Sequence, residues 1–289
     1  MKTPALLACL ALFFSLPAPS HAQEEVGKRE AKKIVIEWAT YDKAPNYKIE
    51  HEKAVPVATV KKVADALEDV LSQYVLVFRF KPKEKLKVKY LDSRNTYLQE
   101  GGKPSTAGHF SPSDEYLVIL QSPFYELFST VYHEALHQYL HFYVGSGVEI
   151  PIWFNEGLAS YYGEIQVNKA TKKLDYKLIA NRKLRISRDK ILTRSAIPLA
   201  TLFEASYNEF HDKEDGAKEG LYYDQSFAVI YFFMQGMGGK PVFQFAEELK
   251  KTKDPALAYE KILGKERKNL KAIEEQWKQY IAQAKIVEK

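Results

Sequence analysis

The stretch VYHEALHQYL (residues 131–140) carries two histidines four positions apart, with a glutamate directly after the first. On an α-helix, positions four apart project from one face, about 6 Å apart along the axis. His133 and His137 could therefore bind one zinc ion, and Glu134 would lie beside the pair as a base for a metal-activated water. The alternative is an amphipathic helix with two surface histidines, and a third ligand would decide between the two.

A catalytic zinc site needs a third protein ligand and an open fourth position. His141 continues the row of histidines, but it lies about 12 Å along the axis from His133, which is too far to reach the same ion. A histidine six residues after His137 is excluded as well, because Tyr143 occupies that position. The third ligand must therefore come from further along the chain.

Glu156 is the remaining candidate, with 18 residues between it and His137. It stands in PIWFNEGLASYYGE (residues 151–164), after the segment GSGVEIP (residues 145–151), whose glycines and proline would end the first helix and reverse the chain. A second helix would then lie alongside the first and direct a carboxylate at the same ion. His133, His137 and Glu156 together would provide the three protein ligands of one Zn²⁺ per chain.

The combination of HEALH, the 18-residue interval and a glutamate inside WFNEGLA resembles the gluzincin metallopeptidases, in particular the active site of the M1 aminopeptidases. The resemblance implies a zinc-dependent peptidase in which Glu134 is the general base and a tyrosine on a later helix donates a hydrogen bond to the oxyanion. Tyr223 in YYDQSFAVIYFF (residues 222–233) matches that tyrosine, with Tyr222 as the alternative register. Tyr223 also lies on an apolar helical face, so a place in the core is the competing interpretation.

The chain departs from the M1 pattern in two ways. It lacks the Gly-x-Met-Glu-Asn segment that holds a substrate's free amino terminus in those aminopeptidases, and it is too short for their large flanking domains. Aminopeptidase specificity therefore does not follow. Over nearly its whole length the chain is more similar to the small peptidase-MA-like proteins, a family of predicted exported hydrolases, through looser matches outside the ligand triad.

Two other functions stay open at this point. One is a non-catalytic zinc-containing protein that binds peptides or envelope partners on the same scaffold, although such a site would have no need of Glu134 as a base. The other is a hydrolase of a non-peptide amide, such as a cell-wall crosslink. A nucleic-acid partner is not expected, because the formal charge of +5 is mild and the lysines of KPKEKLKVKY (residues 81–90) alternate with apolar residues instead of forming a dense block.

Residues 1–22 have the layout of a secretory signal peptide, with Lys2, an apolar run over residues 5–16, and small residues before an expected cleavage point after Ala22. The run is shorter than the roughly 20 apolar residues that span a bilayer, so no stable membrane insertion is expected after cleavage. We expect an exported chain, either periplasmic or secreted. Because Cys9 is the only cysteine, the mature chain would contain no disulfide and would need an ordinary hydrophobic core.

The periodicity of apolar residues predicts an α+β fold, and the resemblance implies that it is zincin-like. Residues 23–144 would form the N-terminal α/β part, with a small mixed sheet and the HExxH helix, and residues 145–289 a mainly helical part with the glutamate ligand. Strands are expected at 46–52, at 85–91 and as a pair joined at SPSD within 107–120. Helices are expected at 55–75, around Tyr97, at 125–143, from Trp153 onward, and at 198–210, 222–237, 255–264 and 270–283, with a hairpin or extended excursion at 169–188.

Three further expectations concern the surroundings of the site. The strand that ends near Leu120 could pair with an extended peptide substrate, with Gly108 to Phe110 as the alternative edge. Trp153 and Phe154 are expected in the core. Asn155 is expected to cap the helix that follows it.

Overall fold

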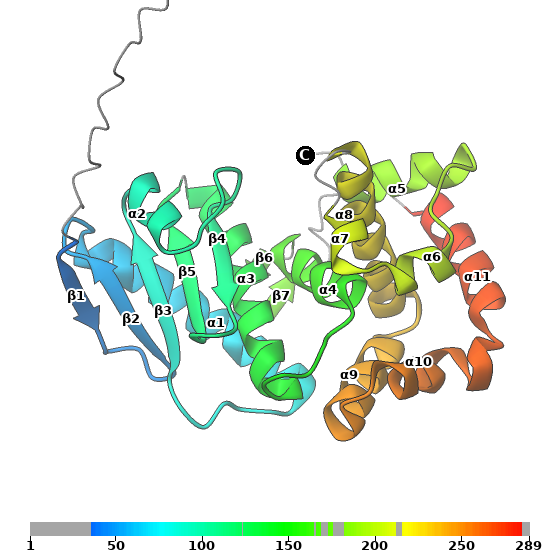
Figure 1. Cartoon of the computed structure of the whole chain (residues 1–289), viewed down its shortest axis with the longest axis horizontal. Coiled ribbons are helices and arrows are strands. Elements are labelled where there is room, and N and C mark those ends of the chain that lie inside the picture. The colour runs from blue at the N-terminus through cyan, green and yellow to red at the C-terminus, as the bar shows by residue number, and fades with distance from the viewer. Residues whose placement is uncertain are drawn as a thin grey trace, which may run out of the picture. The chain divides into compact units, whose positions relative to one another are not determined.

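The structure is a computed structural model, and Figure 1 shows its arrangement of helices and strands. It describes residues 36–122, 124–164, 166–168, 173–175, 182–211 and 216–284. The expected signal peptide at 1–22 lies outside the described residues, as does much of the segment 169–188. None of the helices in the described part of the chain combines the length and the apolar character that a membrane crossing requires.

A five-stranded mixed sheet forms the N-terminal part of the described chain (Figure 1). The three central strands are parallel, and each edge strand is antiparallel to its neighbour. The helix α1 (Val57–Phe78) provides the crossover that the parallel pair β2–β3 requires. The strands, in the spatial order β1-β2-β3-β5-β4, are β1 (Trp38–Tyr41), β2 (Tyr47–Glu52), β3 (Leu86–Leu91), β4 (Gly108–Ser111) and β5 (Tyr116–Leu120).

Both faces of the sheet are covered, because successive side chains of a strand point to opposite sides. In β5, Leu117 packs in the main core together with residues of α1 and α3 (Phe124–Val144). Its neighbour Val118 packs in a smaller core with Tyr97 of α2 (Arg94–Gln99). The sheet therefore separates the helix that carries the two histidines from α2.

The edge strand beside α3 is β4. From the sequence, the strand that ends near Leu120 is favoured as the strand that pairs with a peptide, and the structure corrects this. The strand β5, which ends at Leu120, pairs with β3 on one side and with β4 on the other. Its backbone groups are used by both neighbours, so it cannot pair with a peptide. The turn at SPSD leads from β4 into β5, which lies between β4 and β3, and this leaves the alternative edge, Gly108 to Phe110, with one open side.

Helices form most of the chain after α3. The helix α4 packs between α3 and α8, and α8 continues into a π-helical turn, Phe232–Gly236. A small antiparallel hairpin, β6 with β7, follows α4. The elements of this part are α4 (Ile152–Glu164), β6 (Gln166–Asn168), β7 (Lys173–Asp175), α5 (Arg182–Leu192), α6 (Leu199–Glu204), α7 (Tyr207–Phe210), α8 (Gly216–Tyr231), α9 (Lys240–Thr252), α10 (Pro255–Leu263), a 3₁₀ turn (Lys265–Arg267) and α11 (Leu270–Ala282).

The predicted α+β class with a small mixed sheet is confirmed, and one predicted helix is wrong. The single helix expected at 198–210 is divided into α6 and α7. Ser206 starts the second helix, because its hydroxyl accepts a hydrogen bond from the backbone N–H of Glu209 while the Glu209 carboxylate accepts one from the backbone N–H of Ser206. The strand β1 and the helices α5 and α9 were not predicted.

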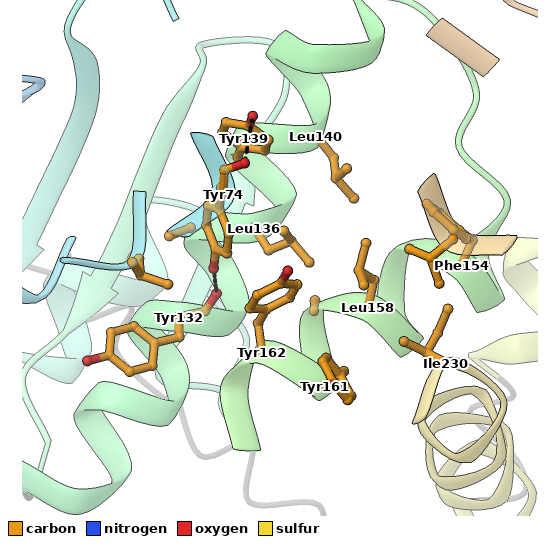
Figure 2. Close-up of a cluster of buried hydrophobic side chains, with 14 of the residues drawn as sticks. Tyr74, Tyr132, Leu136, Tyr139, Leu140, Phe154, Leu158, Tyr161, Tyr162 and Ile230 are labelled. Carbon is orange, nitrogen blue, oxygen red and sulfur yellow. Dashed lines mark hydrogen bonds between the residues drawn. The ribbon is translucent and has the colours of Figure 1, made fainter. Parts of the chain in front are cut away.

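Tyrosine side chains of α1, α3 and α4 meet in the core (Figure 2). The hydroxyl of Tyr74 donates a hydrogen bond to the backbone oxygen of Tyr132 at 2.7 Å, and that of Tyr139 donates to the backbone oxygen of Phe80 at 2.8 Å. The ring of Tyr162 meets that of Tyr74 edge-on, with 5.0 Å between the ring centroids. These contacts fix α3 against α1, and Tyr162 joins α4 to the same cluster.

Candidate metal centre

The start of α4 is anchored by aromatic side chains. The carbonyl oxygen of Pro151 accepts hydrogen bonds from two backbone N–H groups of the first turn. The indole N–H of Trp153 donates to the hydroxyl of Tyr259 at 2.5 Å, and that hydroxyl donates to the backbone oxygen of Phe203 at 2.7 Å. Trp153 and Phe154 are both buried, as predicted. The helix therefore has a fixed rotation about its axis.

Two glycines allow α4 to lie close to its neighbours. A Cβ atom on Gly157 would come within 2.7 Å of the backbone oxygen of Ser226 on α8. A Cβ atom on Gly163 would lie 3.1 Å from the backbone oxygen of Ser129 and 3.4 Å from Cβ of His133 on α3. Because only a residue without a side chain fits at Gly157, the helix can present the preceding residue, Glu156, toward α3.

The structure brings His133, His137 and Glu156 together. The two Nε2 atoms of the histidines lie 3.1 Å apart. One carboxylate oxygen of Glu156 lies 3.3 Å from Nε2 of His133, and the other lies 3.6 Å from Nε2 of His137. All three side chains are mostly buried, between 11% and 23% exposed. Among the described residues, this is the group of His, Cys, Asp and Glu side chains whose geometry could hold a metal ion.

These distances suit a small tetrahedral ion. Three ligand atoms at roughly 2.0–2.1 Å from a tetrahedral zinc lie about 3.3–3.4 Å from one another. The two histidine nitrogens lie 3.1 Å apart and one oxygen of Glu156 lies 3.3 Å from Nε2 of His133, both near that value. The approach of 3.6 Å to Nε2 of His137 is made by the other oxygen of the same carboxylate. Two imidazole nitrogens and one carboxylate oxygen are also a donor set that zinc accepts, with a fourth position left for water or substrate. The residues present therefore fit the ion.

Asn155 orients one of the ligands and does not cap α4, which corrects the sequence-based expectation. The helix begins before it, at Ile152, so Asn155 lies inside the first turn. Its side-chain oxygen lies 2.9 Å from Nδ1 of His137. When the neutral ring carries its proton on Nδ1, that N–H donates a hydrogen bond to the side-chain oxygen of Asn155. Nε2 then keeps its lone pair for a metal.

Without a metal, the centre holds a proton. Burial lowers the pKa of His137, but the adjacent carboxylate of Glu156 outweighs this effect and raises that pKa to about 9. Burial raises the pKa of Glu156, but the two histidines outweigh it and hold that pKa well below its usual range. His137 is therefore a cation paired with anionic Glu156, and a metal ion must displace its proton to bind.

Glu134 lies between the metal centre and the edge strand β4. A Cβ atom on Gly108 would lie 2.9 Å from Cγ of Glu134 and 2.7 Å from Cγ2 of Thr130, so the glycine makes room for the glutamate. Burial lowers the pKa of His137, and the charge of Glu134 adds to the larger effect of Glu156 that raises it. The predicted base is therefore within electrostatic range of the candidate ligands and next to Gly108 of β4.

The structure separates the roles of Tyr222 and Tyr223 on α8. Tyr222 is buried, with its ring centroid 5.3 Å from that of Phe210. Tyr223 is half-buried, and its pKa is raised strongly by burial and then by the negative charges of Glu156, Glu219 and Glu134. Tyr222 is thus a core residue, whereas Tyr223 is the tyrosine within electrostatic range of the metal centre.

His141 is not part of the centre, as expected from its position two turns beyond His133. Its ring packs against Phe110 of β4, with 5.2 Å between the centroids. Burial lowers the pKa of His141. This histidine therefore belongs to the packing between α3 and the edge strand.

Three residues that lie near Tyr223 were not predicted from the sequence, namely His211, Glu219 and Tyr207. Nδ1 of His211 lies 3.0 Å from a carboxylate oxygen of Glu219, and the ring of Tyr207 packs on His211 with 4.3 Å between centroids. The His211 ring lies 5.8 Å from that of Tyr223. Nothing in the local sequence distinguishes these residues, because the spacing of His211 and Glu219 matches no ligand motif and the exposed tyrosine follows no pattern.

No protein-family model matches this chain, and no curated protein matches it at a significant level. The geometry of the chain's own residues is therefore the basis for assigning a function.

Proposed function

We propose that this chain is an exported zinc-dependent metallopeptidase of the gluzincin kind, in which His133, His137 and Glu156 hold the metal and Glu134 is the general base. The proposal rests on one observation: the Nε2 atoms of the two histidines lie 3.1 Å apart, and the Glu156 carboxylate approaches them to 3.3 and 3.6 Å through its two oxygens, with a second carboxylate next in sequence to the first ligand. The export part rests on the sequence of residues 1–22 alone.

A zincin-like arrangement of the fold belongs to the same proposal. It is supported by a mixed sheet whose antiparallel edge strand, β4, packs against α3, the helix with both histidines. It is also supported by the helical part that follows, which supplies the glutamate from α4.

In this proposal each side chain has a defined task. When bound, zinc would supply Lewis-acid chemistry, lowering the pKa of water and polarising the scissile carbonyl. Glu134 takes a proton from the attacking water and passes it to the departing amine. Tyr223 donates a hydrogen bond to the oxygen on which charge develops, and its raised pKa means that the hydroxyl keeps its proton at neutral pH.

The edge strand offers a place for an extended peptide. The backbone N–H of Leu120 donates to the oxygen of Ala107 at 2.8 Å, which makes these two a hydrogen-bonded pair of the antiparallel ladder. Because such pairs alternate, the N–H and C=O groups of Gly108 and Phe110 point away from β5. Among the described strands none pairs on that side. A substrate strand bound there would pass Glu134.

The test combines metal analysis with cleavage of a mixed peptide library, read by mass spectrometry. We expect about one zinc per chain and cleavage by the wild type. Glu134→Gln should keep the zinc and lose roughly 10²- to 10⁴-fold in turnover. The matched control is Glu149→Gln, the same chemical change at an exposed position between α3 and α4, which should retain full activity.

Three results would contradict the proposal or part of it. Equal cleavage by wild type and Glu134→Gln would reject the assigned base. Zinc without cleavage would favour the non-catalytic peptide-binding protein. A protein that binds no zinc, with or without activity, would reject the metal centre.

A further inference from the structure

Tyr207 is an exposed aromatic residue that the structure holds in a fixed position. Its side chain is 62% exposed. It is the first residue of α7, which begins with the capping box of Ser206 and Glu209. The Glu209 carboxylate accepts hydrogen bonds from the backbone N–H and the hydroxyl of Ser206 at 2.8 and 2.7 Å. The backbone that carries Tyr207 is therefore well defined.

One face of the Tyr207 ring packs against the ring of His211, with 4.3 Å between the ring centroids and 54° between the planes. His211 is itself held, because Nδ1 lies 3.0 Å from the carboxylate of Glu219 and Phe210 packs beside it. The phenol thus packs on a ring that is held by a hydrogen bond to Glu219. One side of Tyr207 is used in this contact, and most of the ring remains accessible.

A row of rings leads from Tyr207 through His211 to Tyr223. The centroid of His211 lies 5.8 Å from that of Tyr223, and Phe210 lies 4.9 Å from Tyr223 on the same side. Tyr223 is within electrostatic range of both Glu156 and Glu134, and Tyr207 also contributes to its raised pKa, after burial and the carboxylates. Tyr207 therefore lies at the margin of the site, on the side formed by α7 and α8.

We propose that Tyr207 is a substrate-binding residue that stacks on an aromatic side chain of a peptide near the scissile bond. This inference rests on the proposed peptidase function and adds a substrate class to it. A ring that is already immobilised loses little conformational entropy when it is covered, so an aromatic contact there contributes nearly its full value. Aromatic pairs favour offset or edge-to-face contacts, and the accessible ring of Tyr207 can provide either.

The first experiment scans one phenylalanine through an otherwise alanine-rich peptide and compares kcat/KM at each position. At one position the wild type should prefer phenylalanine over alanine. Tyr207→Ala should reduce that preference roughly three- to tenfold, because it should raise KM for the phenylalanine peptide much more than for the alanine peptide. Tyr207→Phe, which keeps the ring, should retain the preference.

Leu257→Ala is the matched control, because Leu257 is also an exposed apolar residue but lies on α10, which packs on α9 away from α7 and α8. It should leave the preference unchanged. If Tyr207→Ala lowers kcat/KM equally for the phenylalanine and alanine peptides, or changes neither, the assigned role of Tyr207 is overturned while the peptidase function stands.

A second measurement separates this inference from the function on which it rests. Calorimetry with the zinc-loaded Glu134→Gln protein measures binding of the same peptides without turnover. Tighter binding of the phenylalanine peptide that is lost with an added Tyr207→Ala supports the subsite, even if the wild type cleaves nothing and the peptidase proposal fails. Equal affinity for both peptides, in a protein that binds them, overturns the subsite.

Discussion

The two sides of α3 are built in opposite ways. The side that faces α1 carries large tyrosines, such as Tyr132 and Tyr139 (Figure 2). The hydroxyl of Tyr139 donates a hydrogen bond to the backbone oxygen of Phe80. The side that faces α4 carries His133 and His137, and α4 has a glycine, Gly163, where it approaches this side, with an added Cβ atom 3.4 Å from Cβ of His133. We call these the tyrosine side and the histidine side.

The comparison shows how one helix combines stability with chemistry. Burial of aromatic area and satisfied hydroxyls on the tyrosine side stabilise the position of α3. The histidine side instead places two imidazoles and a carboxylate close together, an arrangement that is costly to bury unless its charges are paired or bound to a metal. We therefore expect changes on the histidine side to alter metal binding and changes on the tyrosine side to alter stability alone.

Removal of the metal should have the largest effect. A ligand present at about 1,000 times its Kd stabilises the folded state by about 4 kcal/mol. We expect urea denaturation to show a loss of that order when a chelator replaces zinc. His137→Ala serves as the control, because it should bind zinc weakly and respond little to the chelator. Identical denaturation curves for the wild type with and without zinc would show that the histidine side holds no ion.

Gly157→Ala should have the second-largest effect, because the new Cβ atom would lie 2.7 Å from the backbone oxygen of Ser226. Forcing a methyl group into such a contact costs roughly 1–3 kcal/mol in the free energy of unfolding, and it should also weaken zinc binding by shifting Glu156. The control is Gly220→Ala on α8, where the described residues place no atom within 4 Å of the new Cβ apart from the backbone of the same helix. That change should raise stability by about 0.5–1 kcal/mol. A neutral Gly157→Ala would mean that α4 has room to move.

Asn155→Ala should lower zinc affinity roughly 10- to 100-fold, because His137 would lose the acceptor that orients its ring. Competition with a chromophoric chelator measures this directly. Asn155→Asp keeps an oxygen at the same position and should retain most of the affinity. If Asn155→Ala binds zinc as the wild type does, the contact at 2.9 Å does not orient the ligand.

Tyr139→Phe should have the smallest effect and should act on stability only. The buried backbone oxygen of Phe80 would lose its donor, at a cost of about 1 kcal/mol. Zinc affinity should stay within about twofold of the wild type, since the ring remains in place. Tyr143→Phe provides a comparison, because the Tyr143 hydroxyl makes no hydrogen bond to another described residue, and its loss should change stability less. A clear drop in zinc affinity for Tyr139→Phe would contradict the expectation that changes on the tyrosine side alter stability alone.

Much of this arrangement could be predicted from local pattern. The spacing of His133 and His137 places both on one helical face, and the interval to Glu156 allows a reversal and a second helix. The turn at SPSD and the cap of Asp254 on α10 are equally local, and both are present in the structure. Such features depend on a few neighbouring residues, which is why sequence alone indicates them.

Other features depended on contacts between distant segments. The sequence does not indicate that β5 lies inside the sheet, because strand order is decided by long-range pairing. From the sequence, Asn155 was predicted to cap a helix. Its contact with His137 depends on the packing of α3 against α4. The break at Ser206 competes with a good helical pattern and is decided by the capping box together with the packing of Phe210 against α8.

The sequence by itself determined the chemistry that this chain can offer: which residues could be metal ligands, which carboxylate lies beside them, and that they stand on two successive helices. Tertiary structure alone decided which strand adjoins Glu134, which tyrosine of α8 lies within electrostatic range of the candidate ligands, and that Tyr207 and His211 pack beside that tyrosine. The physical reason is range. Helical periodicity acts over a turn or two of chain, whereas the surroundings of a site are set by packing between segments far apart in sequence.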